Sequence, residues 1–214
     1  MISKFMRVAA FVAALILVTS VSQAAILAVD FNGGSPTQAG FVQQADNNET
    51  FGSSTVQTSV NDFFDRSNLN SIAQPGAVFT DLYRDFIYNN QADGFINFTV
   101  SGLTPSTSYV VTVYAFDFET GATAPVVTFL PTPSTATTGT SSFVAYTPNA
   151  APTTQHQYST DLVLTSTTDV LSFTALANVS ASLRVNGFEI NAVPEPASLV
   201  LLGIGGLFLL RRRR

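Results

Sequence analysis

Residues Phe95–Phe116 read FINFTVSGLTPSTSYVVTVYAF and carry the clearest strand pattern of the chain. Its first part alternates in the manner of a strand, and the side chains that share one face are Ile96, Phe98 and Val100. The segment Gly102–Tyr109 follows, in which Pro105 sets a turn among small polar residues. A second run of apolar and β-branched residues, Tyr109–Phe116, begins directly afterwards. This pattern predicts two strands joined by a short turn.

The same pattern recurs along the chain. Strand-length apolar runs alternate with clusters of Gly, Pro, Asn and Ser, and no comparable stretch between residues 25 and 192 shows helical periodicity. The predicted strands are Ile26–Phe31, Ser54–Val60, Leu82–Tyr88, Phe95–Val100, Tyr109–Phe116, Val126–Phe129, Phe143–Tyr146, Asp161–Leu164, Val170–Thr174 and Leu183–Ile190. About ten strands in a body of this length predict an all-β fold, a two-sheet antiparallel jelly-roll sandwich.

The turn before Tyr109 resembles turns of known β-domains. Gly102-Leu103-Thr104-Pro105, followed by this tyrosine, is similar to the tyrosine-corner segment of fibronectin type III domains, where the hydroxyl bonds back to local backbone. The Gly-Leu-Thr-Pro turn also occurs in galactose-binding-like jelly rolls, in which an opening strand is matched by a closing strand. Here those strands would be Ile26–Phe31 and Leu183–Ile190. The body has no Trp and exceeds one fibronectin domain in length, so it resembles the second group.

Charge is distributed unevenly. Six of the nine basic residues lie near the two ends, and between residues 25 and 192 the cations are Arg66, Arg84 and Arg184. Nearly all of the 14 acidic residues lie in that same stretch. An acidic body without a basic patch argues against nucleic-acid binding, because phosphate contacts need Lys and Arg. The absence of Cys and the single His exclude thiolate chemistry and any site that needs two imidazoles.

The N-terminus has the three parts of a secretory signal. Lys4 and Arg7 form a positive region, Val8–Val18 is an apolar helix too short for a comfortable bilayer span, and Ser22-Gln23-Ala24 supplies small residues for signal peptidase. We therefore predict that residues 1–24 are a signal peptide cleaved after Ala24, with cleavage after Ala25 as the second choice. The alternative is a retained N-terminal anchor.

The C-terminus, residues 193–214, has an equally ordered layout. Val193-Pro194-Glu195-Pro196 precedes the uncharged run Ala197–Leu210, and the chain then closes with Arg211, Arg212, Arg213 and Arg214. A helix over the apolar run would rise about 21 Å, short of a hydrocarbon core of about 30 Å, and snorkelling arginines close part of that gap. The arginine cluster should stay in the cytoplasm. A C-terminal transmembrane helix is therefore expected.

This layout resembles the PEP-CTERM sorting domain of Gram-negative bacteria. The resemblance rests on Pro194, Glu195 and Pro196, on the glycine-bearing apolar helix, and on the terminal arginines. It implies recognition by the membrane protease exosortase and loss of the tail near the motif, so the three motif residues are an enzyme's substrate. The precursor would be membrane-anchored and the mature protein would lie at the cell surface or outside the cell. The alternative is a permanent single-span anchor with a chance Pro-Glu-Pro.

Candidate ligand-binding residues in the body are few. Asp117 and Glu119 follow a strand and point to one face by their spacing; solvated acids at a strand end are the plain interpretation, and a loop that binds calcium or a sugar hydroxyl is the functional one. Arg84 and Asp85 lie inside an aromatic run and face opposite sides of a strand, so each needs another partner, either in a structural ion pair or in a ligand. His156 lies in a polar loop without a triad partner.

A structural calcium is a further possibility. Asp30 and Glu189 lie on the first and last predicted strands, and the galactose-binding-like resemblance implies that these ends come close and can frame a calcium ion. Two acids are a small part of the oxygen shell that calcium needs. Flat aromatic surfaces for sugars would have to come from tyrosines, namely Tyr83, Tyr88, Tyr114, Tyr146 and Tyr158, which are equally suited to the core.

Two classes of function remain. The first is a non-enzymatic exported surface or matrix protein whose sandwich binds polysaccharide. The second is a small hydrolase acting on extracellular polysaccharide, and a purely structural role without a ligand is also open. The sequence shows no marked acid pair, metal cluster or nucleophile motif, so the first class is favoured and no enzymatic activity is expected.

Overall fold

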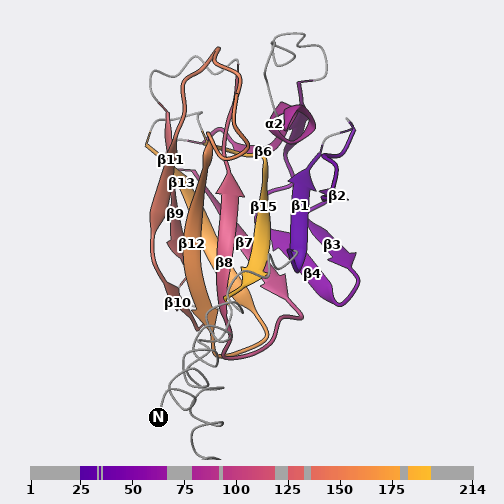
Figure 1. The fold of residues 1–214 in the computed structure, drawn as a ribbon, viewed down its shortest axis with the longest axis vertical. Coiled ribbons are helices and arrows are strands. Elements are labelled where there is room, and N and C mark those ends of the chain that lie inside the picture. Colours follow the sequence, from indigo (N-terminus) through magenta and orange to yellow (C-terminus); the bar gives the residue numbers. More distant parts are fainter. Residues whose placement is uncertain are drawn as a thin grey trace, which may run out of the picture.

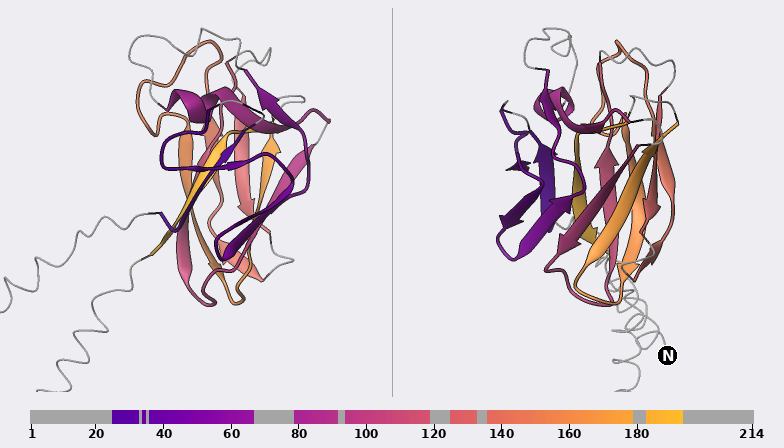
Figure 2. Two further views of the ribbon diagram at one scale, coloured as in Figure 1. Left: turned by 90° about the vertical axis from the view of Figure 1, so that its right-hand side faces the viewer. Right: turned by 180° about the vertical axis from the view of Figure 1, so that it is seen from behind.

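Two six-stranded sheets pack face to face, and a small third sheet lies at one end (Figures 1 and 2). The computed structural model describes residues 25–32, 34, 36–66, 79–91, 94–118, 125–132, 136–178 and 183–193. The first sheet has the order β10 (Thr137–Gly139), β12 (Ser159–Ser166), β8 (Ser108–Tyr114), β15 (Gly187–Ala192), β1 (Leu27–Phe31) and β2 (Val42–Gln44). The predicted signal helix and C-terminal transmembrane helix lie outside the described residues. Within the described part, no helix is both long and apolar enough to cross a membrane.

The second sheet has the order β11 (Ser142–Ala145), β9 (Val126–Pro131), β13 (Leu171–Ala177), β7 (Phe95–Ser101), β4 (Ser54–Thr58) and β3 (Asn48–Phe51). The third sheet has the order β14 (Leu183–Val185), β6 (Asp85–Asn89) and β5 (Phe63–Asp65), and the short helix α2 (Thr80–Arg84) precedes β6. Neighbouring strands are antiparallel apart from β1 and β2. A predominantly antiparallel sandwich is thus confirmed.

Phenylalanine side chains from the two large sheets meet in the core. Phe98 of β7 stacks on Phe31 of β1 with ring centroids 5.5 Å apart, and on Phe173 of β13 at 4.9 Å. Phe188 of β15 meets Phe173 edge-on at 5.7 Å. All four rings are fully buried. Each such aromatic pair contributes about 0.5–1.5 kcal/mol beyond its buried area, so this cluster helps to hold the two sheets together.

Local patterns predicted most strands correctly. The alternation in Phe95–Val100 is confirmed, since Ile96, Phe98 and Val100 are buried while their neighbours are partly exposed. Seven other predicted strands are observed with small changes at their ends, namely β1, β4, β8, β9, β11, β12 and β13. Four short strands were not predicted: β2, β3, β5 and β10.

The tyrosine corner is also confirmed. The Tyr109 hydroxyl accepts a hydrogen bond from the Thr104 N–H (2.9 Å) and donates one to the Thr104 carbonyl (3.2 Å). Because β7 belongs to the second sheet and β8 to the first, this corner fixes the place where the chain crosses the sandwich.

The prediction of one strand over Leu82–Tyr88 was wrong. The chain forms α2 first and enters β6 only at Asp85. Adjacent side chains of a strand face opposite sides, whereas Leu82 and Tyr83 are both buried. Tyr83 lies edge-on to Tyr114, with ring centroids 5.9 Å apart, on the outer face of the first sheet. A helical turn lets Leu82 and Tyr83 both pack there, which two adjacent residues of a strand could not do.

The prediction of one strand over Leu183–Ile190 was also wrong, because the chain changes sheets at Asn186. Asn186 is fully buried and forms four hydrogen bonds to three neighbouring segments. Its backbone bonds the Phe31 N–H and the Tyr114 carbonyl, at 2.8 and 2.9 Å. Its side chain bonds the Asp85 carbonyl (2.7 Å) and the Phe116 N–H (2.6 Å). This one residue ends β14, begins β15 and joins the third sheet to the first.

The two ends of the described body lie side by side. Ile26 N–H donates to the Ile190 carbonyl, and Val193 N–H donates to the Ser108 carbonyl, both at 2.8 Å. The opening and closing strands, β1 and β15, therefore pair as predicted. The third sheet joins at Asn186, beyond the opposite end of β8, whose seven residues span about 20 Å. Figure 1 shows this arrangement, with α2 and β6 at the end of the sandwich away from the start of β1 and the end of β15.

Candidate ligand-binding site

The outer face of the third sheet gathers aromatic and arginine side chains. Phe64 of β5 is in register with Phe86 of β6, and Tyr88 of β6 with Arg184 of β14. Arg66 follows β5 with the same parity as Phe64, so strand alternation places all five on one face. We call Phe64, Arg66, Phe86, Tyr88 and Arg184 the aromatic–arginine face. Of their alternating neighbours, Ile87 and Val185 are buried in the core.

The three rings of this face form a stepped apolar surface. Phe64 and Phe86 stack with centroids 5.6 Å apart and planes 14° apart. Tyr88 meets each of them edge-on at 6.1 Å. Phe64 is 40% exposed, whereas Phe86 lies almost wholly beneath its neighbours. The five residues and Asn90 line an open hollow of about 260 Å³.

Both guanidinium groups lie on these rings. The Arg66 Cζ atom is 4.7 Å from the Phe64 centroid, and the Arg184 Cζ atom is 5.1 Å from the Tyr88 centroid. Both also approach Phe86, at 5.6 and 5.3 Å. Cation–π contacts of this kind contribute about 0.5–1 kcal/mol each at exposed sites and hold the guanidinium planes in place.

Asp117 forms hydrogen bonds and ion pairs with both arginines. Its Oδ1 accepts from Arg66 Nε (3.3 Å), and its Oδ2 accepts from Arg66 Nη2 (3.1 Å) and Arg184 Nε (3.3 Å). Asp117 is 1% exposed. The plain interpretation of Asp117 as a solvated strand-end acid was therefore wrong, because two cations from distant segments cover it. A buried carboxylate needs such partners, since desolvating it alone is costly.

The other candidate residues of the body lie elsewhere or beyond the described part. Arg84 ends α2 and pairs with Asp65 (Nε–Oδ1, 3.9 Å), so the structural ion pair expected for it is confirmed. Asp65 alternates with Phe64 and so lies on the opposite side of the third sheet. Asp85, the register partner of Asp65, is fully buried. Glu119 lies outside the described residues.

Asp30 and Glu189 lie on the outer face of the first sheet but have separate partners. Asp30 Oδ2 accepts from the Gln38 N–H at 2.7 Å, and Glu189 Oε1 accepts from the Tyr114 hydroxyl at 2.7 Å. Burial raises the pKa of Asp30 from 3.8 to about 7, with a smaller contribution from nearby Asp81. In the described ranges no three His, Asp or Glu side chains gather into a metal-binding group. The calcium site stays a prediction.

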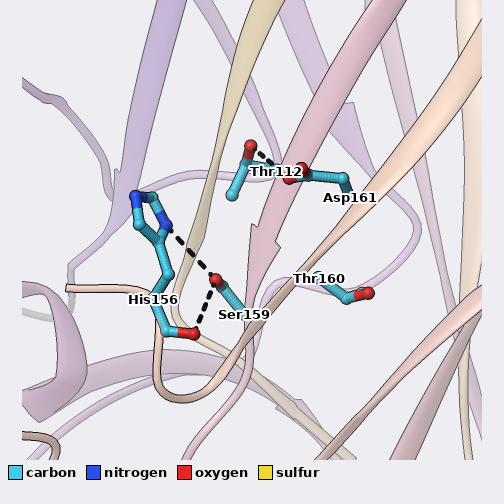
Figure 3. A pocket seen from close by; sticks show the side chains of 5 residues that line it. All are labelled: Thr112, His156, Ser159, Thr160 and Asp161. Atoms are coloured by element: carbon cyan, nitrogen blue, oxygen red, sulfur yellow. Dashed lines mark hydrogen bonds between the residues drawn. The ribbon is translucent and has the colours of Figure 1, made fainter. Parts of the chain in front are cut away.

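A second hollow, of about 380 Å³, lies on the outer face of the first sheet (Figure 3). Its walls are Thr112, His156, Ser159, Thr160 and Asp161. The Thr112 hydroxyl donates to Asp161 Oδ1 at 2.7 Å. Ser159 Oγ donates to the His156 carbonyl (3.2 Å) and lies 3.3 Å from His156 Nδ1. The Thr112 and Ser159 hydroxyls are thus both hydrogen-bonded to residues that line the same hollow.

Of the five tyrosines considered as sugar platforms, four are core residues: Tyr83, Tyr114, Tyr146 and Tyr158 are buried. Tyr88 alone of the five is partly exposed, and it lies on the aromatic–arginine face. Sequence reasoning did not single out Phe64, Phe86, Arg66 or Arg184 as a site. The sequence did contain an indication of this site, because Arg66, one of only three cations in the body, follows two phenylalanines in the segment Phe63-Phe64-Asp65-Arg66.

A family model described as the PEP-CTERM protein-sorting motif matches residues 192–214. The chain carries a PEP-CTERM sorting motif. This motif indicates an exported protein that is processed by exosortase, in agreement with the interpretation of Pro194, Glu195 and Pro196. The match covers about a tenth of the chain, so the PEP-CTERM motif gives the destination of the body and leaves its ligand open.

No curated protein sequence matches the chain. Among solved structures, the crystal structure of the Penaeus vannamei nodavirus P-domain is similar at 19% identity, with a TM-score of 0.35. That similarity covers 50% of this chain and 94% of the viral one. A similarity of this size carries no conclusion about the body.

Proposed function

We propose that this protein is a non-enzymatic surface or extracellular-matrix protein whose β-sandwich binds polysaccharide through the aromatic–arginine face. The observation that carries the proposal is the composition of that face. In an acidic body, the third sheet presents three aromatic rings, two guanidinium groups and the Asn90 side chain around one open hollow.

These groups match the chemistry of a sugar ring. The C–H edges of a pyranose pack on an aromatic face, and its hydroxyls are hydrogen-bonded by planar donors such as guanidinium and amide groups. The Arg66 and Arg184 groups are already held by Asp117 and by the rings, so binding loses little side-chain entropy. The hollow is open, as a site for one stretch of a long polymer needs to be.

The position of the face supports display to the exterior. The ends of the body lie at one end of the sandwich and the third sheet lies at the other. A precursor held by its C-terminal segment would therefore present the aromatic–arginine face away from the membrane. The two large sheets and the pairing of β1 with β15 support a galactose-binding-like jelly roll as the fold of this module.

Hydrolysis of the polysaccharide is the second candidate function, and one observation favours it. Thr112 of β8 has Asp161 as register partner on one side and Glu189 on the other, which places two carboxylates on one face of three adjacent strands. Their Cα atoms are separated by two strand spacings, about 10 Å, whereas the carboxyl groups of glycosidase pairs lie about 5–9.5 Å apart. Both carboxylates are engaged by hydroxyls, Thr112 and Tyr114, which favours a structural role.

The test compares binding and turnover in the same sample. The full chain, kept in a mild detergent, is measured by affinity electrophoresis through gels containing a range of bacterial and plant polysaccharides. Binding to at least one of them is expected, and Phe64→Ala should weaken it about tenfold, equivalent to about 1.4 kcal/mol. Phe143→Ala is the matched control, because Phe143 is also an exposed ring (62%) but lies on β11.

Release of reducing ends decides between the two functions. Turnover that disappears in both Asp161→Asn and Glu189→Gln would establish the hydrolase and overturn the non-enzymatic proposal. Binding that is lost equally in Phe64→Ala and Phe143→Ala would show that the aromatic–arginine face is not the site.

A further inference from the structure

The outer face of the second sheet carries no charged side chain among the described residues of its strands. Alternation and register assign to that face the odd-numbered residues of β4, β7 and β11 and the even-numbered residues of β3, β9 and β13. None of these is Asp, Glu, Lys, Arg or His. We call this surface the uncharged face, and the right-hand view of Figure 2 looks onto the sheet from this side. The outer face of the first sheet, by contrast, carries Asp30, Asp161 and Glu189.

Acidic residues lie beside the uncharged face but not on it. Glu49 of β3 is in register with the buried Val56, so it points to the inner side of the sheet. Asp46, Asp62 and Asp169 lie in the segments that connect the strands. A partner that covers the uncharged face therefore meets negative charge only beyond the ends of the strands.

A row of four side chains crosses the middle of the uncharged face. Register places Phe143, Thr128, Leu176 and Phe95 side by side on β11, β9, β13 and β7. Phe143 is 62% exposed and Phe95 is 49% exposed. The two phenylalanines are three strand spacings apart, about 14 Å. The row thus has an exposed aromatic ring at each end.

Several polar side chains of the uncharged face are hydrogen-bonded to one another across neighbouring strands. A polar group that is paired in this way costs less to remove from water than one that depends on water for its partner. These pairs prepare the face for burial against a dry surface. They are Thr174 Oγ1 with Asn97 Oδ1 (2.7 Å), Thr50 Oγ1 with Thr55 Oγ1 (3.0 Å) and Gln57 Nε2 with Asn48 Oδ1 (3.4 Å).

We propose that the uncharged face binds the same face of a second copy of this chain. The two second sheets pack face to face in the aligned manner of β-sandwiches, about a two-fold axis that runs parallel to the strands over the middle of the row. This axis reverses the row, so Phe143 of each copy packs on Phe95 of the other. It also leaves Val193 of both copies at one end of the dimer, as two precursors held by one membrane require. The two aromatic–arginine faces then lie together at the other end, so the dimer is bivalent for polysaccharide.

A second copy suits this face better than a polysaccharide does. Sugar hydroxyls are recognised by polar groups that are available to them, whereas polar groups of the uncharged face already bond each other. Two chains of net charge −5 repel each other least where both present an uncharged surface.

The size of the face sets the expected affinity. Six strands at a spacing of about 4.8 Å, with a mean length of about 18 Å, give a plane of about 500 Å². This area is at the small end of specific protein interfaces, so we expect a dissociation constant in the micromolar range.

Sedimentation equilibrium of the full chain tests the association, in a nonionic detergent whose density is matched by the buffer. Between about 1 and 100 µM protein, the mass should rise from that of one chain towards that of two. Raising the salt from low to physiological concentration should tighten the dimer, because salt screens the repulsion between two acidic bodies.

Charge variants locate the contact. Thr128→Glu should weaken the dimer at least tenfold, because the two-fold axis brings residue 128 of both copies within about one strand spacing of each other. Val163→Glu is the matched control, since it places the same charge at an exposed position (43%) on the outer face of the first sheet, and it should leave the association unchanged.

A mixture of two variants tests the geometry directly. Thr128→Lys alone should weaken the dimer as Thr128→Glu does. An equal mixture of the two should associate more tightly than either variant alone, because opposite charges then face each other. Such a rescue would also show that both variants fold.

The possible outcomes separate the occupants of the face. A wild-type chain that stays monomeric at 100 µM would overturn the proposal without any variant. A dimer that survives Thr128→Glu and Val163→Glu equally well would place the contact elsewhere and also overturn it. Both results would leave polysaccharide binding by the aromatic–arginine face standing. Loss of polysaccharide binding in Thr128→Glu, at concentrations where wild type is monomeric, would assign the uncharged face to a sugar polymer instead of a second copy.

Discussion

Replacing Asp30 with asparagine should stabilise the protein most strongly at neutral and alkaline pH. Asp30 is fully buried, and its Oδ2 accepts one hydrogen bond, from the Gln38 N–H. Asparagine retains an oxygen acceptor for that bond and replaces the other carboxyl oxygen by an uncharged NH2 group. Burial is the main cause of the raised pKa, Asp81 adds to it, and Arg84 and the Gln38 N–H oppose it.

The magnitude follows from linkage. The pKa of Asp30 is about 7 in the folded state against an ordinary value of 3.8. Between these values the folded chain holds a proton that the unfolded chain has released, so the Asp30 contribution to stability falls as pH rises from about 4 to about 7, and is then constant. At 1.36 kcal/mol per pKa unit, the total loss is about 4 kcal/mol.

The assay is urea unfolding of the full chain in a nonionic detergent, followed by circular dichroism between pH 4 and pH 8. The difference in unfolding free energy between Asp30→Asn and wild type should grow by about 4 kcal/mol over this range. Asp169→Asn is the control, because it removes a carboxylate of the same type that is exposed. A difference between Asp30→Asn and wild type that is independent of pH would refute the argument.

Three further outcomes are expected. In Gly187→Ala the new Cβ would lie 2.3 Å from the Val29 carbonyl oxygen, so thermal denaturation should show a loss of at least about 2 kcal/mol. Tyr109→Phe leaves the Thr104 backbone without its partner, and the same measurement should show a loss of about 1–3 kcal/mol. Intact mass of the exported protein should show the loss of both residues 1–24 and the arginine tail, whereas a retained Arg214 would contradict processing by exosortase.

Features written in contiguous sequence were predictable. The Gly-Leu-Thr-Pro turn with Tyr109, the alternation of Phe95–Val100 and the order of the Pro-Glu-Pro motif all depend on neighbours a few residues apart. Each of these features can be recognised from a short segment, so the two-sheet fold and the sorting motif could be predicted from the sequence.

Features set by long-range packing were not predictable. The break at Asn186 exists because β1, β6 and β8 each supply a hydrogen-bond partner to one side chain or its backbone. The helical turn α2 depends on a surface for Leu82 and Tyr83 that other strands provide. The aromatic–arginine face combines Phe64, Tyr88 and Arg184, which lie on three different strands. The sequence around each of them does not indicate that these strands form one small sheet.

The position of β15 also constrains when the body can fold. β15 lies between β8 and β1 near the middle of the first sheet, yet it is the last strand of the described chain. Its pairing with β1 joins residues more than 150 positions apart, the kind of non-local contact that makes folding slow. The sheet therefore stays split into two incomplete halves until Gly187–Ala192 has emerged. The last strand needed to complete the first sheet is therefore the segment that adjoins the sorting motif.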